Sequence, residues 1–148
     1  MVTLRRARVL VVERDDALRR STAEVVATGG HEVREAADSS SALALALTFR
    51  PDIALVHVGL ADAWTLVTAL RADPSTRACA IIATGGSPVS AYVREPGLRE
   101  VEAYLLKPAD PAFLLAVVTG ALKGGGVAER ASRDWPIVDG DGTADGPG

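Results

Sequence analysis

The sequence predicts an α/β domain in which five βα units form a parallel, doubly wound sheet between two layers of helices, a three-layer (βα)5 arrangement. The chain has 148 residues, of which 48% are hydrophobic and 24% charged, as is typical of one globular domain. Within residues 1–122, short aliphatic runs alternate with longer segments of helical period. Because the short runs are almost continuously apolar, we expect strands that are buried on both faces.

Five apolar runs are the expected strands, and a helical segment follows each of them. The runs cover residues 7–12, 32–36, 53–58, 78–83 and 103–106. Parallel strands that are joined in this order need right-handed crossovers, so the helices cover both faces of the sheet.

The first two helices have clear start and stop signals. The first is expected to begin at Asp15 or Asp16, whose carboxylates suit an N-cap, and to end at the glycines 29–30. The second is expected to begin at the serine cluster 39–41 and to end before Pro51, because proline disfavours helix in the residue that precedes it.

Three further helices are expected, of which the fourth has the poorest pattern. Asp62 suits the cap of the third helix, which closes at residues 73–74. Residues 87–88 and 110–111 each place a proline directly after a capping residue, as helix starts do. The helix that starts at residue 88 meets Pro-Gly at 96–97, so it has room for little more than two turns.

Residues 123–148 are expected to form a disordered tail outside the domain of residues 1–122. The tail is rich in Gly and Asp and holds seven of the 14 glycines. Subtracting its three basic and five acidic residues from the 16 and 19 of the chain leaves the domain 13 positive and 14 negative charges, a net −1. Trp135 lies in the tail's hydrophobic island, residues 134–138, which either docks on this domain, a second copy or a partner, or is a stray apolar patch.

Charge and cysteine content exclude several functional classes. A net charge of −3 does not provide the excess of basic residues that would attract nucleic acid or anionic lipid. No apolar run reaches the roughly 18 residues of a membrane span, and no leader with a cleavage site opens the chain. The single cysteine, Cys79, cannot form an internal disulfide, so we expect a cytoplasmic protein that binds neither nucleic acid nor membrane.

Polar side chains follow four of the expected strands, at the edge where open parallel sheets bind ligands. They are Glu13, Arg14, Asp15 and Asp16 after the first strand, His57 at the end of the third, Thr84 after the fourth and Lys107 after the fifth. Their shared position makes this edge the candidate site.

Four segments around these residues resemble the signature segments of the CheY-like receiver domains of bacterial response regulators. They are VLVVERD at 9–15, PDIALVH at 51–57, IIATG at 81–85 and YLLKP at 104–108. The resemblance covers roughly residues 5–122, and it implies a flavodoxin-like sheet with strand order 2-1-3-4-5.

The resemblance also implies a chemistry. In receivers, two acids after the first strand and an Asp at the end of the third hold Mg²⁺, and that Asp accepts a phosphoryl group. A Thr or Ser after the fourth strand and a Lys after the fifth bind the phosphoryl oxygens, and an aromatic residue on the fifth strand changes orientation. Thr84, Lys107 and the switch aromatic Tyr104 match this pattern.

The metal and acceptor positions depart from the pattern. Glu13 keeps an acid, but Arg14 stands at the position of the metal-binding Asp and His57 at that of the acceptor Asp. With His57 neutral, the charges of Glu13, Arg14 and Lys107 sum to about +1, whereas the family's three carboxylates and one lysine sum to about −2. This change in net charge disfavours the binding of a divalent cation. We therefore expect no Mg²⁺ and no other cofactor, with Arg14 and Lys107 both paired to Glu13 and Asp15 as a further partner.

Two of the site residues allow more than one interpretation. His57 could fill the vacated position through a hydrogen bond, respond to pH or a ligand, accept a phosphoryl group or bind a transition metal. Tyr104 suits either core packing or the family's switch.

The resulting functional prediction is a degenerate receiver, a pseudo-receiver that is not an enzyme and acts as a phosphorylation-independent interaction module. The resemblance implies a binding face between Ser87 and Leu122 for a kinase, a regulator or another receiver, and a homodimer is possible. Only 26 residues follow Leu122, so we expect the output to lie in a separate protein. The alternatives are a sensor of small anions that uses Arg14, Lys107 and Thr84, and a phosphotransfer protein whose acceptor is Asp15 or Asp16.

Overall fold

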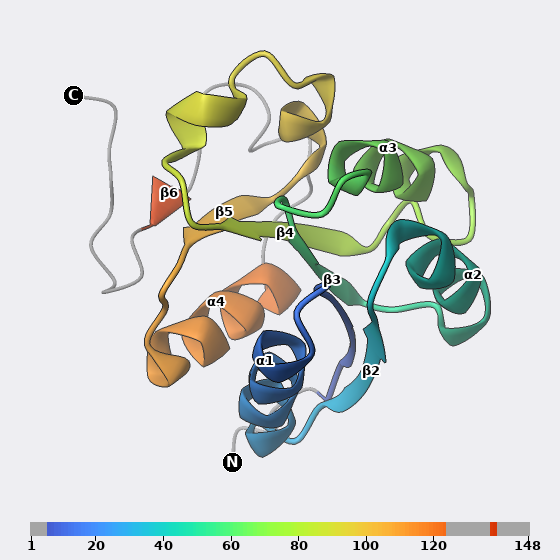
Figure 1. The fold of residues 1–148 in the computed structure, drawn as a ribbon. Helices are drawn as coiled ribbons and strands as arrows, with labels where there is room; N and C mark the ends of the chain where they lie inside the picture. Colours follow the sequence, from blue (N-terminus) through green and yellow to red (C-terminus); the bar gives the residue numbers. More distant parts are fainter. Residues whose placement is uncertain (1–5, 124–136, 139–148) are drawn as a thin grey trace.

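The computed structural model describes residues 6–123 and 137–138, which contain one parallel sheet flanked by helices (Figure 1). The strands are β1 (Arg8–Val12), β2 (Glu32–Ala36), β3 (Ile53–His57), β4 (Ala80–Gly85), β5 (Ala103–Leu106) and β6 (Ile137–Val138). Their order in the sheet is β2-β1-β3-β4-β5-β6. The first five strands confirm the predicted doubly wound α/β fold and the order 2-1-3-4-5.

The helices of the described residues cover both faces of the sheet. They are α1 (Asp16–Thr28), α2 (Ser39–Phe49), α3 (Ala63–Ala72) and α4 (Pro111–Lys123). Figure 1 shows α1 and α4 together on one face, and α2 and α3 on the other. This arrangement is the predicted three-layer domain.

The helix caps agree with the sequence in two places and differ in two. Asp15 caps α1, because its carboxylate accepts the Leu18 N–H at 2.9 Å, and Asp110 accepts the Phe113 N–H in α4 at 3.2 Å. The cap of α2 is Asp38, which accepts the Ser41 N–H at 2.7 Å, and not the serine cluster itself. Asp62 precedes α3 but makes no capping hydrogen bond, because its backbone is not in the extended conformation that a cap adopts.

The predicted fourth α-helix is wrong. Between β4 and β5 the chain forms two short 3₁₀ segments, η1 (Val89–Tyr92) and η2 (Pro96–Glu100). The stretch between Pro88 and Pro96 is too short to recover the cost of nucleating an α-helix, and Val89 and Val93 are β-branched. The face that receivers form from their fourth helix is therefore built differently in this chain.

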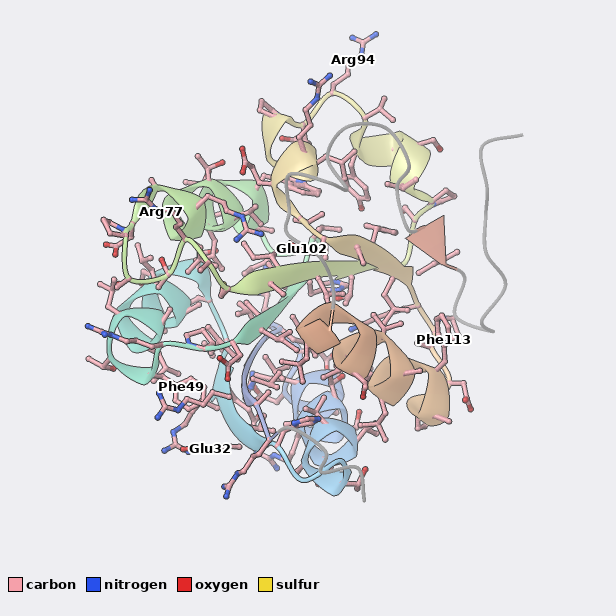
Figure 2. The ribbon with its side chains drawn as sticks, turned by 180° about the vertical axis from the view of Figure 1, so that it is seen from behind. Glu32, Phe49, Arg77, Arg94, Glu102 and Phe113 are labelled. Carbon is pink, nitrogen blue, oxygen red and sulfur yellow. The ribbon has the colours of Figure 1, made fainter. Side chains whose placement is uncertain are left out.

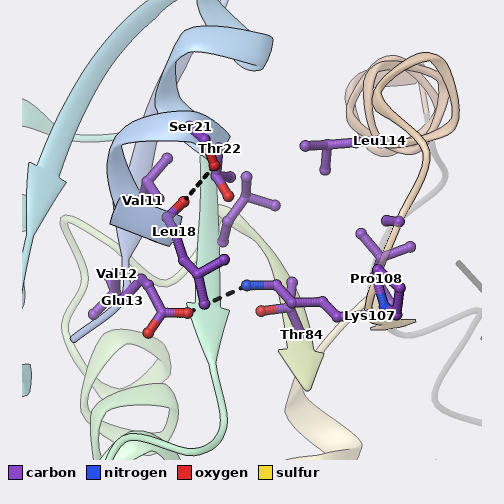
Figure 3. A pocket seen from close by; sticks show the side chains of 13 residues that line it. Val11, Val12, Glu13, Leu18, Ser21, Thr22, Thr84, Lys107, Pro108 and Leu114 are labelled. Atoms are coloured by element: carbon purple, nitrogen blue, oxygen red, sulfur yellow. Dashed lines mark hydrogen bonds and ion pairs between the residues drawn. The ribbon is translucent and has the colours of Figure 1, made fainter. Parts of the chain in front are cut away.

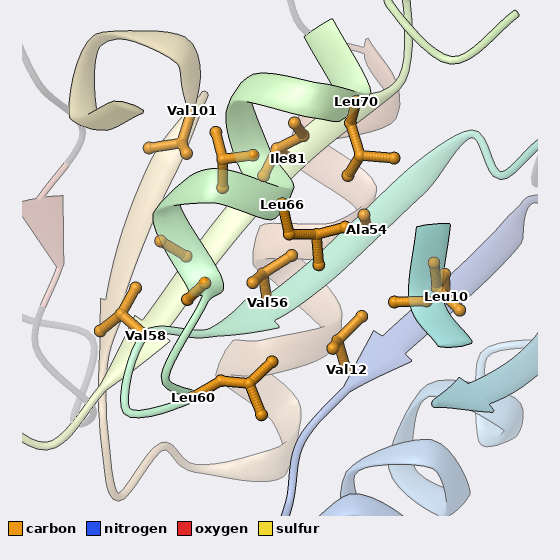
Figure 4. Packing of buried hydrophobic residues seen from close by; sticks show 14 of the residues in the cluster. Leu10, Val12, Ala54, Val56, Val58, Leu60, Leu66, Leu70, Ile81 and Val101 are labelled. Atoms are coloured by element: carbon orange, nitrogen blue, oxygen red, sulfur yellow. The ribbon is translucent and has the colours of Figure 1, made fainter. Parts of the chain in front are cut away.

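The hydrophobic core has two parts, one on each side of the sheet, because successive strand residues point to opposite faces. In β1, Leu10 and Val12 belong to the cluster under α2 and α3, which Figure 4 shows, whereas Val9 and Val11 belong to the cluster under α1 and α4. Full burial of one such side chain stabilises the fold by about 1.5–3 kcal/mol. The two clusters hold the strand ends, and hence the site, in fixed positions.

A buried ion pair ties α3 to the amino-terminal ends of β4 and β5. The Arg71 guanidinium on α3 donates to both carboxylate oxygens of Glu102, which directly precedes β5, and to the backbone oxygens of Cys79 and Glu100. Glu102 in turn accepts the Ile81 N–H of β4 at 3.1 Å. Figure 2 shows Glu102 in the interior and Arg77 at the surface.

The tail contributes one described element. Residues 137–138 form β6, which runs parallel to β5 with Ile137 opposite Tyr104 and Val138 opposite Leu105. The rest of the predicted tail after Lys123, including Trp135, lies outside the described residues. In the described part of the chain, no helix has the length and apolar content that crossing a membrane requires.

Candidate functional site

The carboxyl ends of β1, β3, β4 and β5 bring Glu13, His57, Thr84 and Lys107 to one rim of the sheet. His57 and Thr84 are register partners at the ends of β3 and β4. The Lys107 ammonium Nζ lies 3.2 Å from Glu13 Oε1, and His57 Nδ1 lies 3.4 Å from the same oxygen. The structure thus places these four predicted residues next to one another.

Glu13 is the buried centre of this group. Its side chain is only 5% exposed, and both of its carboxylate oxygens are used. Oε1 accepts a hydrogen bond from Lys107, and Oε2 accepts the backbone N–H of Asp15 at 3.1 Å. The ammonium of Lys107 therefore balances the one buried carboxylate at the rim.

The His57 ring lies against Gly59. A Cβ at position 59 would stand 2.6 Å from His57 Nε2, so a larger residue there would force the ring to move. Burial lowers the pKa of His57, the carboxylate of Glu13 opposes that effect, and the charge of Lys107 adds to it. His57 is therefore a neutral imidazole at neutral pH, with its Nδ1 buried and without a hydrogen-bond partner of suitable geometry in the described residues.

Arg14 does not take the place that the sequence predicted for it. Its side chain is exposed and forms no ion pair or hydrogen bond with any described residue, so the expected pairing with Glu13 is wrong. The reason is geometric, because consecutive residues at a strand end point in opposite directions and Glu13 points inward. Asp15 is not an ion-pair partner either, since its side chain caps α1.

The donor set at the rim does not fit Mg²⁺. This ion requires near-octahedral oxygen ligation, mostly from carboxylates and water. The buried carboxylate, Glu13, accepts N–H donors on both oxygens, and the imidazole of His57 stands at the position of the family's acceptor Asp. Within residues 6–123 and 137–138, no group of three or more His, Cys, Asp or Glu side chains is arranged to hold a metal ion.

Two clefts adjoin the Glu13–Lys107 pair. The first is open to solvent, has a volume of about 430 Å³ and is lined by Glu13, Arg14, Asp15, Leu18, His57 and Gly59. The second has a volume of about 370 Å³ and lies between α1 and α4, with Thr84 and Lys107 at one end (Figure 3). Leu18 lines both clefts and is 49% exposed, so it separates them at the surface.

Tyr104, at the switch position, is fully buried. Its hydroxyl donates to the backbone oxygen of Ser87, and its ring centroid lies 5.8 Å from that of Tyr92. Burial raises the pKa of this hydroxyl well above its usual range. Gly85 lies so close that a Cβ there would collide with the Tyr104 hydroxyl, so the ring is enclosed on this side too.

Sequence reasoning missed two contributors to the site. Leu18 falls within the predicted first helix, and its exposure beside both clefts had no sequence signal. The approach of His57 to Glu13 was also missed, although their places at adjacent strand ends were a signal that could have indicated it.

No protein-family model and no curated protein matches the chain. Solved structures do match. A putative response regulator from Chloroflexus aurantiacus J-10-fl is 29% identical with a TM-score of 0.73, over 81% of this chain and 100% of that one. The chemotaxis response regulator CheY4 of Vibrio cholerae is 25% identical with a TM-score of 0.73, over 80% of this chain and 100% of that one.

NtrX from Brucella abortus shows the same fold within a longer protein. It is 24% identical with a TM-score of 0.72, and the match covers 80% of this chain but only 26% of NtrX. The common part is the doubly wound domain whose strand order is described above. In fold, strand order and part of its sequence this chain is similar to the CheY-like receiver domains of response regulators, and those domains are two-component signalling modules and not enzymes.

Proposed function

We propose that this chain is a pseudo-receiver that signals by binding other proteins, without Mg²⁺ and without phosphorylation. The observation that carries the proposal is the buried Glu13–Lys107 ion pair, with the neutral imidazole of His57 3.4 Å from the same carboxylate. The acid that receivers keep for the metal is already balanced by the chain's own lysine. The acceptor position holds no carboxylate.

The other candidate phosphoryl acceptors have structural roles. The Nδ1 of His57 faces the carboxylate of Glu13, which would repel an incoming phosphoryl group, and its Nε2 lies against Gly59. Asp15 caps α1, and Asp16 pairs with Arg19 at 2.8 Å. These contacts support a module whose conformation does not depend on phosphorylation.

Metal binding and phosphoryl labelling test this proposal directly. The purified chain is titrated with Mg²⁺ in a calorimeter, and its intact mass is measured after incubation with acetyl phosphate and Mg²⁺. We expect no saturable binding at millimolar Mg²⁺ and no phosphoryl adduct. Saturable binding, or an adduct on any residue, would contradict the proposal.

A restored variant makes the negative result interpretable. Arg14→Asp combined with His57→Asp returns the two missing acids, and we expect it to gain Mg²⁺ affinity in the same assay. Arg14→Asn with His57→Asn is the matched control, because it removes the same side chains without adding negative charge. Affinity in the first variant and none in the second would assign the loss to these two positions.

The proposed binding face consists of η1, η2, β5 and α4, within the predicted range from Ser87 to Leu122. Val93, which directly follows η1, is 67% exposed, the highest value among the exposed large hydrophobic residues of the described chain. Figure 2 shows the neighbouring Arg94 pointing away from the molecule. An exposed apolar residue beside a cation suits a protein partner, such as a kinase, a regulator, another receiver or a second copy.

We place this module in a reducing cytoplasm, as the single cysteine predicts. Cys79 is buried and unpaired with any other cysteine, and burial raises the pKa of its thiol to about 11. Its thiolate is therefore scarce at neutral pH, so Cys79 fits a packing role and not redox sensing.

A further inference from the structure

The two sides of the sheet differ in how their sequence protects them against pairing with another strand. β2 forms one edge, and three of its residues are charged, namely Glu32, Arg34 and Glu35. Charged side chains on an edge strand oppose the docking of a further strand. On the other side, β5 consists of Ala103–Leu106 and carries no charge. The sequence of β5 therefore leaves its outer edge competent to pair.

β6 covers this outer edge only in part. Its two residues run parallel to β5, with Ile137 opposite Tyr104 and Val138 opposite Leu105. Figure 1 shows β6 beside β5, on the side of β5 away from β4. The first and last residues of β5 have no register partner in β6. A strand of four or more residues could pair along the whole of β5, so it would gain backbone hydrogen bonds that β6 does not make.

The place of β5 in the fold does not depend on β6. Tyr104 and Leu105 are 0% and 1% exposed, and they belong to the two hydrophobic clusters on opposite sides of the sheet. β5 also pairs with β4 along its inner edge. The outer edge of β5 is therefore expected to keep its shape when β6 leaves it.

The connection between α4 and β6 makes β6 a tethered occupant of the edge. Residues 124–136 join the end of α4 to the start of β6. A segment on so short a connection has an effective concentration on the order of millimolar, so it holds its site against dilute competitors. Only two residues pair, however, and a longer strand that makes more backbone hydrogen bonds can replace them.

The residue types of β6 indicate which strands fit. Ile137 and Val138 are both β-branched, and such residues favour the extended conformation of a strand. The uncharged β5 offers no ion-pair partner to a charged strand. The fitting strand is therefore extended and aliphatic.

We propose that the outer edge of β5 is a docking site for an extended aliphatic strand of another protein, and that β6 is the chain's own occupant of this site. A second copy fits less well, because two copies that pair through β5 must both release β6, whereas a foreign strand displaces only one. The inference rests on the proposed interaction function, because it names the kind of segment that the partner presents.

A peptide that competes with β6 tests the site. The probe is a fluorescein-labelled peptide of residues 134–140 with Pro136→Val, so that four consecutive residues can pair. It is titrated into the full chain and into the full-chain double variant Ile137→Pro with Val138→Pro, in which the prolines remove the N–H donors of β6. We expect the double variant to bind the peptide at least tenfold more tightly by fluorescence anisotropy, with the largest amide chemical-shift changes in residues 103–106.

The matched control is Asp141→Pro with Gly142→Pro, which places two prolines in the tail outside β6. It should bind the peptide as weakly as the unchanged chain does, and hydrogen exchange in β1 and β3 checks that both variants are folded. Equal affinity of the unchanged chain and the β6 variant, or no binding to the β6 variant, would overturn the site. Self-association of the unchanged chain that the peptide abolishes would assign the edge to a second copy and overturn the choice of partner.

The failure of this site can be told apart from the failure of the proposed function. The titration with Mg²⁺ and the labelling with acetyl phosphate report on the rim around Glu13 and His57, and not on the outer edge of β5. A chain that binds no peptide but also takes up neither Mg²⁺ nor a phosphoryl group would lose the strand site and keep the proposed function.

Discussion

At the scale of single residues, His57 differs from the acid that receivers carry at this position in charge and also in how it responds to pH. Its ring is neutral because burial opposes protonation, and the ammonium of Lys107 opposes it as well. In the unfolded chain the same imidazole titrates near 6.5. The folded state therefore binds its proton less readily than the unfolded state does.

This difference predicts a pH-dependent stability. Well above pH 6.5, His57 is neutral in both the folded and the unfolded state, so it does not make the free energy of unfolding depend on pH. As the pH falls below 6.5, the unfolded state takes up the proton first, so the free energy of unfolding decreases until the folded pKa is reached. Urea unfolding at neutral and mildly acidic pH measures the effect. His57→Gln is the control, and an equal loss of stability in that variant would contradict this account.

At the scale of elements, the Arg71–Glu102 pair connects α3 to the strands β4 and β5. The two side chains are 10% and 5% exposed, so neither is well solvated. Replacing Arg71 by Met removes the cation that balances a buried carboxylate, and such a change typically costs about 3–5 kcal/mol. We expect Arg71→Met to lower the free energy of unfolding by that amount in urea titration.

Two comparisons check that the loss comes from the buried charge. Arg77→Met, at an exposed position nearby, is expected to change stability by less than about 0.5 kcal/mol. Arg71→Met with Glu102→Gln removes both charges and should recover part of the loss. If the Arg77 and Arg71 variants were equally stable, the pair would not hold α3 in place.

The segment of η1 and η2 carries a prediction about binding. Val93 is 67% exposed, and replacing it by Asp adds a charge where the proposed partner would bury an apolar group. We expect V93D to weaken self-association or partner binding at least tenfold, without changing the melting temperature, as measured by analytical ultracentrifugation and by partner capture. Leu47→Asp is the matched control, because Leu47 is 41% exposed on α2, on another surface. An equal effect of both variants would argue against this face.

The same segment shows where sequence reasoning fails. Four of the five strands follow from apolar runs that burial on both faces explains. The second, β2, was also predicted at the correct residues, but it is a largely polar strand at the edge of the sheet and is only partly buried. The fourth helix was predicted from the cap-and-proline pattern at residues 87–88, but a local start signal does not establish enough length to propagate a helix before Pro96. Strand-end positions predicted which residues meet at the rim. They could not predict that Arg14 points outward or that Leu18 borders a cleft, because both depend on three-dimensional packing.

At the scale of the whole molecule, β6 changes the outer edge of the sheet. An edge strand exposes a row of backbone N–H and C=O groups that can pair with another chain. In this structure residues 137–138 pair with Tyr104 and Leu105 along the outer edge of β5. The proposed binding face includes β5, so β6 lies at one border of that face.

Truncation separates the effect of β6 from that of the rest of the tail. A chain of residues 1–130 lacks β6, whereas a chain of residues 1–140 keeps it. We expect the shorter chain to exchange the amide hydrogens on the outer edge of β5 at least tenfold faster, because they lose their partners, while β1 and β3 stay protected. It should also self-associate more strongly, as an uncovered edge invites pairing between copies. Hydrogen exchange and sedimentation measure both effects, and identical exchange of β5 in the two chains would mean that β6 does not protect this edge in solution.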